Sequence, residues 1–448
     1  MAKGDVEKLF KNPEKVLLKL ATPVILANGF QTLYNFMDAF WVSLLKNSQY
    51  ALSGIGLVMP FAFSLIALAN GIGIGTNSLI SRSIGKKDKK TADKASTSGF
   101  ALSIIVGIFF GLLLFILSVP LFNAISHGES SENAIKYAKI LFMGAPFLFI
   151  SNLLAAILRA EGDMKRSMFA LAIGSILNVL LDPLFIFGFG MGIEGAALAT
   201  IISRAITIYP LYFWIFKERS SYVHPSLNIT RLDLKLCIEI FKVGIPASLS
   251  LLLLSLSIFL FNTLIQKVYG PLGVTVYITG SRIGSLAVLP ALGIQAAVIT
   301  LTGIWYGAKR HDMVKRTVIY AFKVGILMEG IIGILIFLFS RPIGSIFIHN
   351  AYMKDLLPEI SRYLKTTAIG YPFMPISMFS VGTFNGIGKS IYAFLITTFR
   401  VIIIAYAFAL LYAILFHIGL FGVWLGMLTG TIAASFFGIF LLKVKNIL

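Results

Sequence analysis

The chain has 448 residues, of which 57% are hydrophobic and only 13% are charged. Because soluble proteins carry about 25% charged residues, this composition excludes an ordinary soluble enzyme and favours a protein that crosses a membrane many times. The net charge of +19 does not indicate a nucleic-acid partner, since the basic residues cluster in short loops between apolar segments. The single cysteine, Cys237, excludes a disulfide framework.

Twelve apolar segments are long enough to cross a membrane. They cover residues 16–45, 52–80, 97–122, 135–158, 167–189, 192–216, 236–266, 273–304, 317–340, 359–385, 390–416 and 418–442. Each segment must satisfy its own backbone hydrogen bonds inside the bilayer, so we expect helices. The predicted fold class is an all-α polytopic membrane protein with twelve transmembrane helices.

Basic residues lie mainly in the even-numbered loops. Five lysines fall between residues 86 and 94, whereas the loop at residues 123–134 contains Glu129 and Glu132. The positive-inside rule then places both termini and all even-numbered loops in the cytoplasm, for a protein of the plasma (inner) membrane. One of these loops, the charged hairpin at residues 159–165, is either an anchor at the membrane interface or a contact that stabilises one conformational state.

The second half of the sequence repeats features of the first half in the same order. The KLATP sequence at 19–23 opens the first span, and KVGIP at 242–246 opens the seventh. A repeat of six helices gives both halves the same orientation, which predicts two six-helix bundles related by an axis along the membrane normal. The predicted parts are an N-lobe at 1–216, a cytoplasmic inter-lobe linker at 217–235 and a C-lobe at 236–448.

Two aspartates lie inside predicted membrane spans, and the first of them is Asp38. A carboxylate at the middle of a membrane costs ~2.5–3.5 kcal/mol, and such a residue marks an ion or proton site by default. Asp38 shares a helix face with Gln31 and Tyr34. Pro23 lies in the same span and permits a kink, so we expect a hinge there. The alternative is a polar seam that packs against neighbouring helices.

The second aspartate, Asp182, follows Asn178 by one helical turn in the fifth span, and Thr200 lies in the sixth. Asp38 and Asp182 are expected at comparable depth. Two carboxylates with an amide oxygen and a hydroxyl suit Na⁺, or the two acids share a proton. The alternative is that Arg204 neutralises one aspartate in a buried ion pair.

Neither aspartate has a counterpart in the second half of the chain. When Pro23 is aligned with Pro246, Asp38 falls on Phe261. When Lys165 is aligned with Lys389, Asp182 falls on Tyr406. We therefore place the ion site in the N-lobe alone. Glu329, in the ninth span, is interpreted as a structural polar contact with Lys323, six residues away, and a second ion site is the alternative.

Several of these residues together resemble the multidrug and toxic compound extrusion (MATE) family. The resemblance rests on Pro23, Asp38, the Asn178-x-x-x-Asp182-Pro183 motif, Thr200 and the Arg159-Ala-Glu-Gly-Asp163 loop. It covers the whole chain and is strongest to prokaryotic, including archaeal, members of the DinF-like branch. It implies a V-shaped central cavity between the two bundles and transport by alternating access. It also implies a cation-coupled antiporter, not an enzyme, that exports amphipathic or cationic organic compounds against H⁺ or Na⁺.

The resemblance further implies roles for individual residues. The cation or proton site is formed by Asp38, Asn178, Asp182 and Thr200, which are also the ligands if the ion is Na⁺. The substrate cavity is lined by Gln31, Tyr34, Tyr137 and Asn152. The implied partners are small amphipathic organic substrates and membrane lipids, with no nucleic acid, no cofactor other than the coupling ion, and a monomeric state. The NorM-like branch uses acidic residues of the second lobe, which this chain lacks apart from Glu329.

Two other functions use the same features differently. A flippase for a lipid-linked precursor, from the same superfamily, favours a basic cavity, but Arg204 and Arg400 are the few central basic residues. An intramembrane aspartyl protease would use two aspartates to activate water. Its Tyr-Asp and Gly-x-Gly-Asp signatures are absent, because Asp38 follows Met37 and Asp182 follows Leu181.

Overall fold

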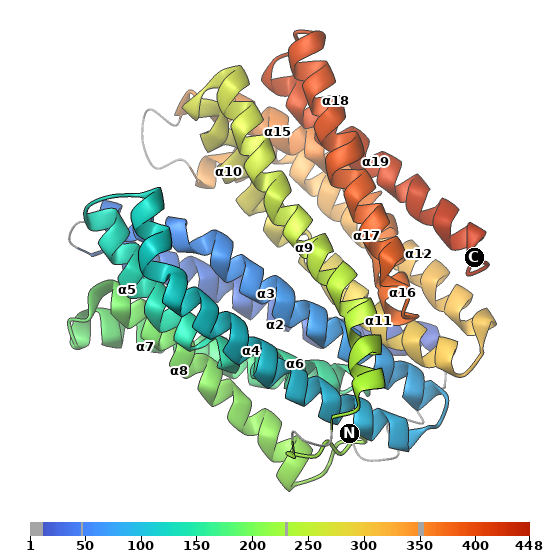
Figure 1. Ribbon diagram of the computed structural model, residues 1–448. Coiled ribbons are helices and arrows are strands. Elements are labelled where there is room, and N and C mark those ends of the chain that lie inside the picture. Colours follow the sequence, from blue (N-terminus) through green and yellow to red (C-terminus); the bar gives the residue numbers. More distant parts are fainter. Residues whose placement is uncertain (1–11, 46–47, 229–231, 348–353) are drawn as a thin grey trace. The chain divides into compact units, whose positions relative to one another are not determined.

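The computed structural model describes residues 12–45, 48–228, 232–347 and 354–448, and these are almost entirely helical (Figure 1). No β-strand occurs within these ranges, and the prediction of an all-α polytopic membrane protein is confirmed. Residues 229–231 of the predicted linker lie outside the described ranges.

The helices follow one another through short connections. Those of the first half are α2 (Pro13–Ser43), α3 (Ser48–Gly85), α4 (Lys89–Ile125), α5 (Glu129–Met143), α6 (Ala145–Ala160), α7 (Met164–Pro183) and α8 (Gly192–Tyr212). Those of the second half are α9 (Leu234–Tyr269), α10 (Pro271–Ala287), α11 (Leu289–Gly307), α12 (His311–Leu338), α13 (Ser340–Ile346), α15 (Leu357–Gly370), α16 (Met374–Gly386), α17 (Ser390–Thr398), α18 (Ala407–Leu410) and α19 (Leu420–Val444). Short π-helical segments extend four of them, namely η1 (Leu184–Gly188), η2 (Phe213–Lys217), η4 (Phe399–Tyr406) and η5 (Leu411–Leu415).

The number of membrane spans differs slightly from the predicted twelve. In the described part of the chain, ten helical segments are long and apolar enough to cross a membrane, or eleven if the bent pair α5 and α6 counts as one span. The predicted span at 359–385 falls on α15 and α16, which have 14 and 13 residues and are each too short to cross alone. The predicted count is therefore not reproduced exactly.

Proline explains where the broken spans divide. Pro146, Pro290 and Pro375 are each the second residue of the helix that follows a break, in α6, α11 and α16. Proline has no backbone N–H to donate to the preceding turn, so it is favoured at the start of a helix, where that N–H would have no partner in any case. The break between α5 and α6 bends the span by 46°.

The turns of the two halves repeat one another in backbone conformation. Lys87 and Lys309 both have a φ of 58°, and Gly162 and Gly388 have φ values of 84° and 81°. These left-handed conformations are uncommon for a lysine and occur at equivalent points, directly before α4 and α12 and directly before α7 and α17. The equivalence agrees with the internal repeat that the sequence indicates.

The helices form two compact units. Unit 1 contains Leu26–Ser248 and Tyr306–Lys309, and unit 2 contains Pro13–Ile25, Leu249–Trp305 and Arg310–Leu448. Each unit thus holds the first part of a helix whose remainder belongs to the other: α2 changes unit after Ile25, and α9 after Ser248. Pro23 and Pro246 lie two residues before these points. The repeat makes α2 and α9 equivalent helices, and both are divided between the units two residues after the equivalent proline, which again agrees with the repeat.

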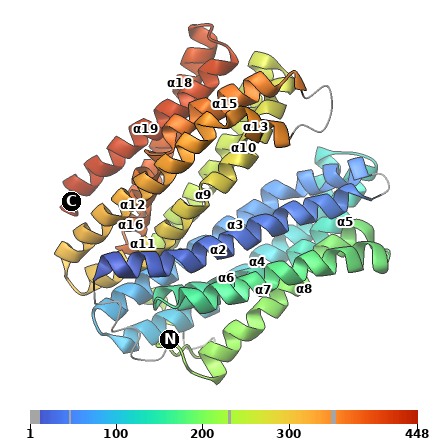
Figure 2. The same cartoon turned by 180° about the vertical axis from the view of Figure 1, so that it is seen from behind.

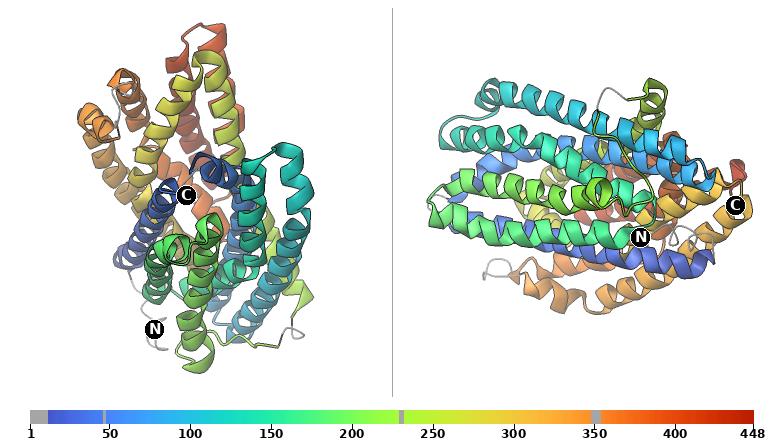
Figure 3. Two further views of the ribbon diagram at one scale, coloured as in Figure 1. Left: turned by 90° about the vertical axis from the view of Figure 1, so that its left-hand side faces the viewer. Right: turned by 90° about the horizontal axis from the view of Figure 1, so that it is seen from below.

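Within unit 1, helices α3, α4, α5 and α6 pack mutually, and α7 packs on α8. Figures 2 and 3 show α6, α7 and α8 lying side by side. The first part of α9 approaches α3 at backbone distance, because a Cβ on Gly71 would lie 2.5 Å from the carbonyl oxygen of Gly244. Small residues permit such close helix packing in membranes.

We expect Gly71→Ala to lower the free energy of unfolding by about 1–3 kcal/mol, because the added methyl group overlaps the backbone of α9. Gly56→Ala on the same helix is the matched control, since a Cβ there meets nothing within 4 Å. That control should be neutral or slightly stabilising. Thermal unfolding in detergent measures both, and equal melting temperatures for the two variants would contradict the close contact of α3 and α9.

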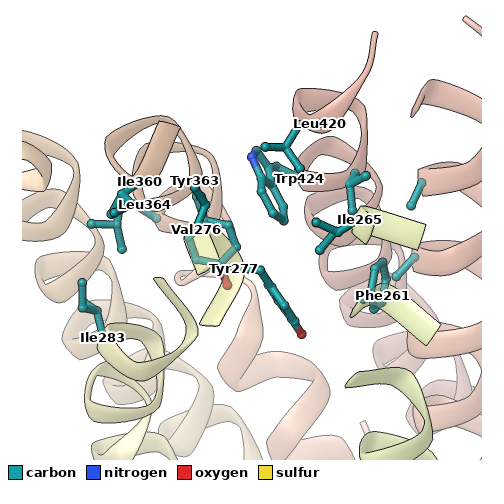
Figure 4. Close-up of a cluster of buried hydrophobic side chains, with 14 of the residues drawn as sticks. Phe261, Ile265, Val276, Tyr277, Ile283, Ile360, Tyr363, Leu364, Leu420 and Trp424 are labelled. Atoms are coloured by element: carbon teal, nitrogen blue, oxygen red, sulfur yellow. The ribbon is translucent and has the colours of Figure 1, made fainter. Parts of the chain in front are cut away.

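Unit 2 has an aromatic core at one end of its helices. Tyr277 of α10 stacks on Trp424 of α19 with ring centroids 6.1 Å apart. Tyr363 of α15 meets the same indole edge-on at 4.7 Å. Figure 4 shows the three rings together with Ile265 of α9. Because all three rings are buried, they hold α10, α15 and α19 in a fixed arrangement.

Candidate functional site

Asp38 of α2 and Asp182 of α7 lie close enough for the charge of one to act on the other. Asp182 is fully buried, and Oδ1 of Asp38 is buried without a hydrogen-bond partner. Two acids in one water-poor region repel each other when both are ionised, so a proton or a cation bound between them relieves the repulsion. The sequence predicted this pairing from depth alone.

Local structure fixes the position of Asp182. Pro183 follows it and ends the regular part of α7, and the π-helical segment η1 continues the chain. A proline cannot donate its backbone nitrogen, and π-helical turns are rare outside functional sites. Asp182 therefore sits at a point where the helix is irregular.

Asn178 connects Asp182 to α8. In the amide orientation that satisfies both neighbours, Asn178 Nδ2 donates to Asp182 Oδ2 at 3.1 Å, and the amide oxygen accepts from the N–H of Thr200 at 3.3 Å. The Thr200 hydroxyl donates to the carbonyl of Ala196 at 3.1 Å, which leaves its lone pairs available. The structure thus brings together Asp182, Asn178 and Thr200, as expected.

Two tyrosines of the predicted substrate cavity also reach the aspartates. Tyr34 lies near Asp38 and Asp182 and within hydrogen-bonding reach of Thr200. Tyr137 of α5 lies near Tyr34 and both acids, and is buried. These two residues surround the carboxylates with hydroxyl groups instead of bulk water.

A small pocket adjoins this group on the side of α8. It is lined by Gln31 and Tyr34 of α2, by Asn178 of α7 and by Thr200 and Arg204 of α8. Its volume is about 20 Å³, room for about one water molecule or a dehydrated cation. The aspartates do not line the pocket themselves; Asn178 and Tyr34 lie between. The pocket suits an ion and is far too small for an organic compound.

Arg204 does not neutralise the acids by direct pairing. It lines the small pocket and acts electrostatically on Tyr34, but no ion pair joins it to Asp38 or Asp182, all three of which the structure describes. The buried ion pair that the sequence left open as an alternative is therefore not formed in this structure.

Asn152 and Pro23 lie elsewhere. Asn152 of α6 donates to Oδ1 of Asn70 on α3 at 2.7 Å. Pro23 lies in the part of α2 that belongs to unit 2, whereas Asp38 lies in the part that belongs to unit 1. No hydrogen bond or ion pair joins either residue to the aspartates in the described structure. The cavity role of Asn152 stays a prediction from the family resemblance, and the hinge at Pro23 stays a prediction from the kink that a proline permits.

Sequence reasoning missed part of the pocket. Ser175 of α7 and Thr207 of α8 also line it, next to Ser203, whose Oγ is buried without a hydrogen-bond partner among the described residues. A signal for Thr207 was present, because Thr200, Ser203 and Thr207 follow the three- and four-residue spacing of one helix face. Extending the polar stripe of α8 by one turn would have identified Thr207.

The equivalent positions of unit 2 hold an aromatic pair. Phe261 and Tyr406, which the repeat sets opposite Asp38 and Asp182, contact each other edge-to-face with ring centroids 5.8 Å apart. In each half, the two positions that the repeat relates therefore lie next to each other. One half fills them with acids, and the other fills them with apolar rings.

Glu329 is fully buried on α12 near the backbone N–H of Ala291 at the start of α11, but neither of its carboxylate oxygens has a hydrogen-bond partner in the described part of the chain. Lys323 is exposed, and the two described side chains form no ion pair. The contact with Lys323 is therefore not formed in this structure, and the structural role of Glu329 stays a prediction beside the alternative of a second ion site.

The hairpin between α6 and α7 holds the linker. Glu161 is fully buried, and its Oε2 accepts the backbone N–H groups of Tyr222 at 2.7 Å and Val223 at 3.2 Å. Burial raises the pKa of Glu161 to about 8, against the opposing effect of these two N–H groups. Asp163 caps α7 by accepting from the N–H of Arg166 at 3.1 Å. Both acids are buried and do not face a membrane surface.

Further contacts bind the linker to α4. Asp93 accepts the N–H of His224 at 2.7 Å, Thr97 accepts that of Ser226 at 2.9 Å, and the Ser98 hydroxyl accepts that of Asp233 at 3.0 Å. The linker backbone is thus hydrogen-bonded along much of its length to side chains of unit 1. Sequence reasoning identified the linker and the hairpin separately but not this contact.

Comparison with known proteins agrees with the repeat. A sequence profile of the MatE family matches residues 23–184 and 246–411, two segments that begin at the equivalent prolines Pro23 and Pro246. The probable multidrug resistance protein NorM of Thermotoga maritima is 29% identical over 452 residues, which cover 95% of this chain and 93% of that protein.

Solved structures match over nearly the whole chain. A crystal structure of a MATE protein in complex with MaL6 has a TM-score of 0.95 and 33% identity, covering 99% of this chain and 98% of that one. The outward-facing conformation of a multidrug resistance MATE family transporter of the MOP superfamily has a TM-score of 0.93 and 32% identity at the same coverage. Neither comparison assigns the chain to the DinF-like branch or to an archaeal source.

Proposed function

The chain belongs to the MATE family of multidrug efflux transporters, and on this premise we propose that it exports amphipathic or cationic organic compounds in exchange for H⁺ or Na⁺. Both termini are cytoplasmic in this proposal, the protein acts as a monomer in the plasma membrane, and a V-shaped cavity between the lobes binds the substrate. Family membership also makes the aspartyl protease alternative unnecessary, because the acids have a use in transport.

One observation carries the proposal: Asp38 and Asp182 interact in a water-poor region, beside a pocket of about 20 Å³. The ion binds among Asp38, Asn178, Asp182 and Thr200. An all-oxygen set with two carboxylates serves a proton or Na⁺ equally, so the ion stays open between these two. The substrate binds in a separate, larger space that Gln31, Tyr34, Tyr137 and Asn152 adjoin.

Coupling follows from the repulsion between the acids. Without a bound ion, both carboxylates carry charge, and the conformation that admits water around them is favoured. Binding of the ion neutralises the pair and favours a conformation in which α2 bends near Pro23. An ion shifts the equilibrium between the transporter's conformations only if it binds one conformation more tightly than the other. Ion and substrate must therefore favour different conformations or compete for binding to the same one.

Transport in proteoliposomes under separate pH and Na⁺ gradients tests this function. We expect efflux of a cationic dye to be driven by one of the two gradients and to stop when an ionophore dissipates that gradient. Dye transport that neither gradient accelerates would contradict the antiporter. Transfer of a labelled lipid-linked precursor under the same conditions, without dye transport, would favour the flippase alternative.

A further inference from the structure

A second, much larger pocket opens at the far end of α12, in unit 2. It has a volume of about 500 Å³ and is formed by the end of α12, by α13, by one side of α15 along most of its length, and by the beginning of α19. Three cationic side chains line it, those of Arg341, Arg362 and Lys365, together with the hydroxyl-bearing residues Ser361 and Thr366. The two hydroxyls are engaged within the protein, since that of Thr366 donates to the carbonyl of Arg362 at 2.8 Å and that of Ser361 pairs with Ser340 at 2.8 Å. The concentration of positive charge in one cavity favours an anion.

The cations are only partly compensated. Arg362 Nη1 donates to Glu359 Oε1 at 2.7 Å, and no other ion pair is formed by the described residues that line the pocket. Arg341 and Lys365 therefore keep their charges available.

Membrane topology does not account for these basic residues. The positive-inside rule explains the lysines and arginines at the cytoplasmic loops. With the predicted orientation, however, α12 begins in the cytoplasm and ends outside, so Arg341, Arg362 and Lys365 lie on the outer side. Cations on that side need a different reason.

The pocket has an apolar side as well. Lys365 lies over the ring of Phe337 at 5.7 Å, and Arg362 lies over that of Phe421 at 5.8 Å. Phe337 and Ile369 are 42% and 50% exposed. Further exposed apolar side chains continue from Phe337 along α12, namely Leu327, Ile331, Ile334 and Leu338. The pocket thus joins cationic side chains to an exposed apolar strip on α12.

The frame around the pocket is rigid. Tyr363 and Leu364, between Arg362 and Lys365, point into the aromatic core of Figure 4, where Tyr363 meets Trp424. The two cations therefore project from a turn of α15 whose other face is fixed by packing. A preformed site loses little conformational freedom when a ligand binds.

We propose that this pocket binds the phosphate headgroup of an anionic phospholipid from the outer leaflet. Arg341, Arg362 and Lys365 hold the phosphate, and the acyl chains lie along Phe337, Ile369 and the strip on α12. The amphipathic shape of the site distinguishes this lipid from free phosphate, which would use the cations alone. The site is independent of the ion site in unit 1.

The first half of the chain offers an internal comparison. Alignment of the two halves places Lys136 on Arg362 and Lys139 on Lys365, with the same spacing between the two cations. The third cation has no counterpart, because Val119 precedes Pro120 where Arg341 precedes Pro342. The double variant K136Q/K139Q therefore removes the same charge from an equivalent helix without touching the pocket.

The experiment uses the delipidated full-length protein in detergent and native mass spectrometry with added phosphatidylglycerol or phosphatidylcholine. We expect one phosphatidylglycerol to be retained in preference to phosphatidylcholine. R362Q/K365Q and R341Q should each weaken its retention by about tenfold, in the range measured for charge-assisted contacts. K136Q/K139Q should retain phosphatidylglycerol like the wild type. Equal phosphatidylcholine binding by all variants shows that they are folded.

Three results would overturn the proposal. The first is equal loss of phosphatidylglycerol from K136Q/K139Q, which would indicate unspecific attraction to the basic protein. The second is retention unchanged by R362Q/K365Q. The third is full displacement of the lipid by inorganic phosphate at millimolar concentration, which would assign the pocket to a free anion.

Discussion

Asp182→Asn is expected to reduce gradient-driven efflux at least about tenfold, in line with typical coupling free energies of about 1–3 kcal/mol. Asparagine keeps the size of the side chain and its contact with Asn178, but it can neither take up a proton nor carry the second charge of the pair. Asp38→Asn should have the same effect, because the two acids act on each other. Efflux from proteoliposomes under the driving gradient measures both variants.

The matched control is Glu194→Gln, which removes one acid from the first turn of α8 and leaves the ion site intact. It should transport at the wild-type rate. The double variant D38N/D182N should transport at about the same rate as either single variant, since both acids serve one step. Wild-type, gradient-dependent efflux by D182N would show that the acids are not the coupling site.

Glu161→Ala is expected to release the linker and to cost about 1–3 kcal/mol, because the backbone N–H groups of Tyr222 and Val223 lose their buried acceptor. Glu161→Gln should cost less, since the amide oxygen still accepts. Hydrogen exchange of the linker amides measures the effect, and it should be faster in E161A than in the wild type. Glu218→Ala is the control: this acid lies 3.7 Å from Arg166 and is partly exposed, so its loss should change little. Unchanged exchange in E161A would contradict a linker held by Glu161.

The same contact should depend on pH. Burial raises the pKa of Glu161 from 4.5 to about 8, so the docked linker binds the proton more tightly than a released one. Docking is then strongest at low pH and weakens as the pH rises through the interval from about 4.5 to 8. The rate of linker proteolysis in the wild type, divided by the rate in E161Q, should rise with pH over this interval. The wild-type linker loses docking as Glu161 ionises, whereas the glutamine variant does not titrate. A constant ratio would mean that Glu161 keeps one protonation state.

Much of the fold was accessible from the sequence, because hydrophobic length and the placement of lysines define spans and loops. What the sequence did not predict depends on tertiary structure. The breaks at Pro290 and Pro375 divide apolar runs that read as continuous, since a proline at the second position of a helix looks like one inside a helix. The change of unit along α2 and α9 follows from packing, which no local pattern contains.

The candidate site shows the same division. Helical spacing connected Asn178 with Asp182, and equal depth connected Asp182 with Asp38, because both arguments need only helix geometry. The family resemblance assigned Tyr137 to the substrate cavity, and only the structure shows that it lies near the two acids. Asn152 bonds to Asn70 instead, a contact between distant parts of the sequence that only packing of α3 on α6 reveals.

The most direct test of the central claim is the reverse reaction. Because coupling is reciprocal, a substrate gradient must move the coupling ion in the opposite direction. Proteoliposomes loaded with a cationic substrate, without any imposed ion gradient, should therefore take up H⁺ or Na⁺ as the substrate leaves. We expect this ion uptake in the wild type and in E194Q and its loss in D182N. Substrate-driven ion uptake that persists in D182N would contradict the claim that the pair Asp38 and Asp182 couples the two fluxes.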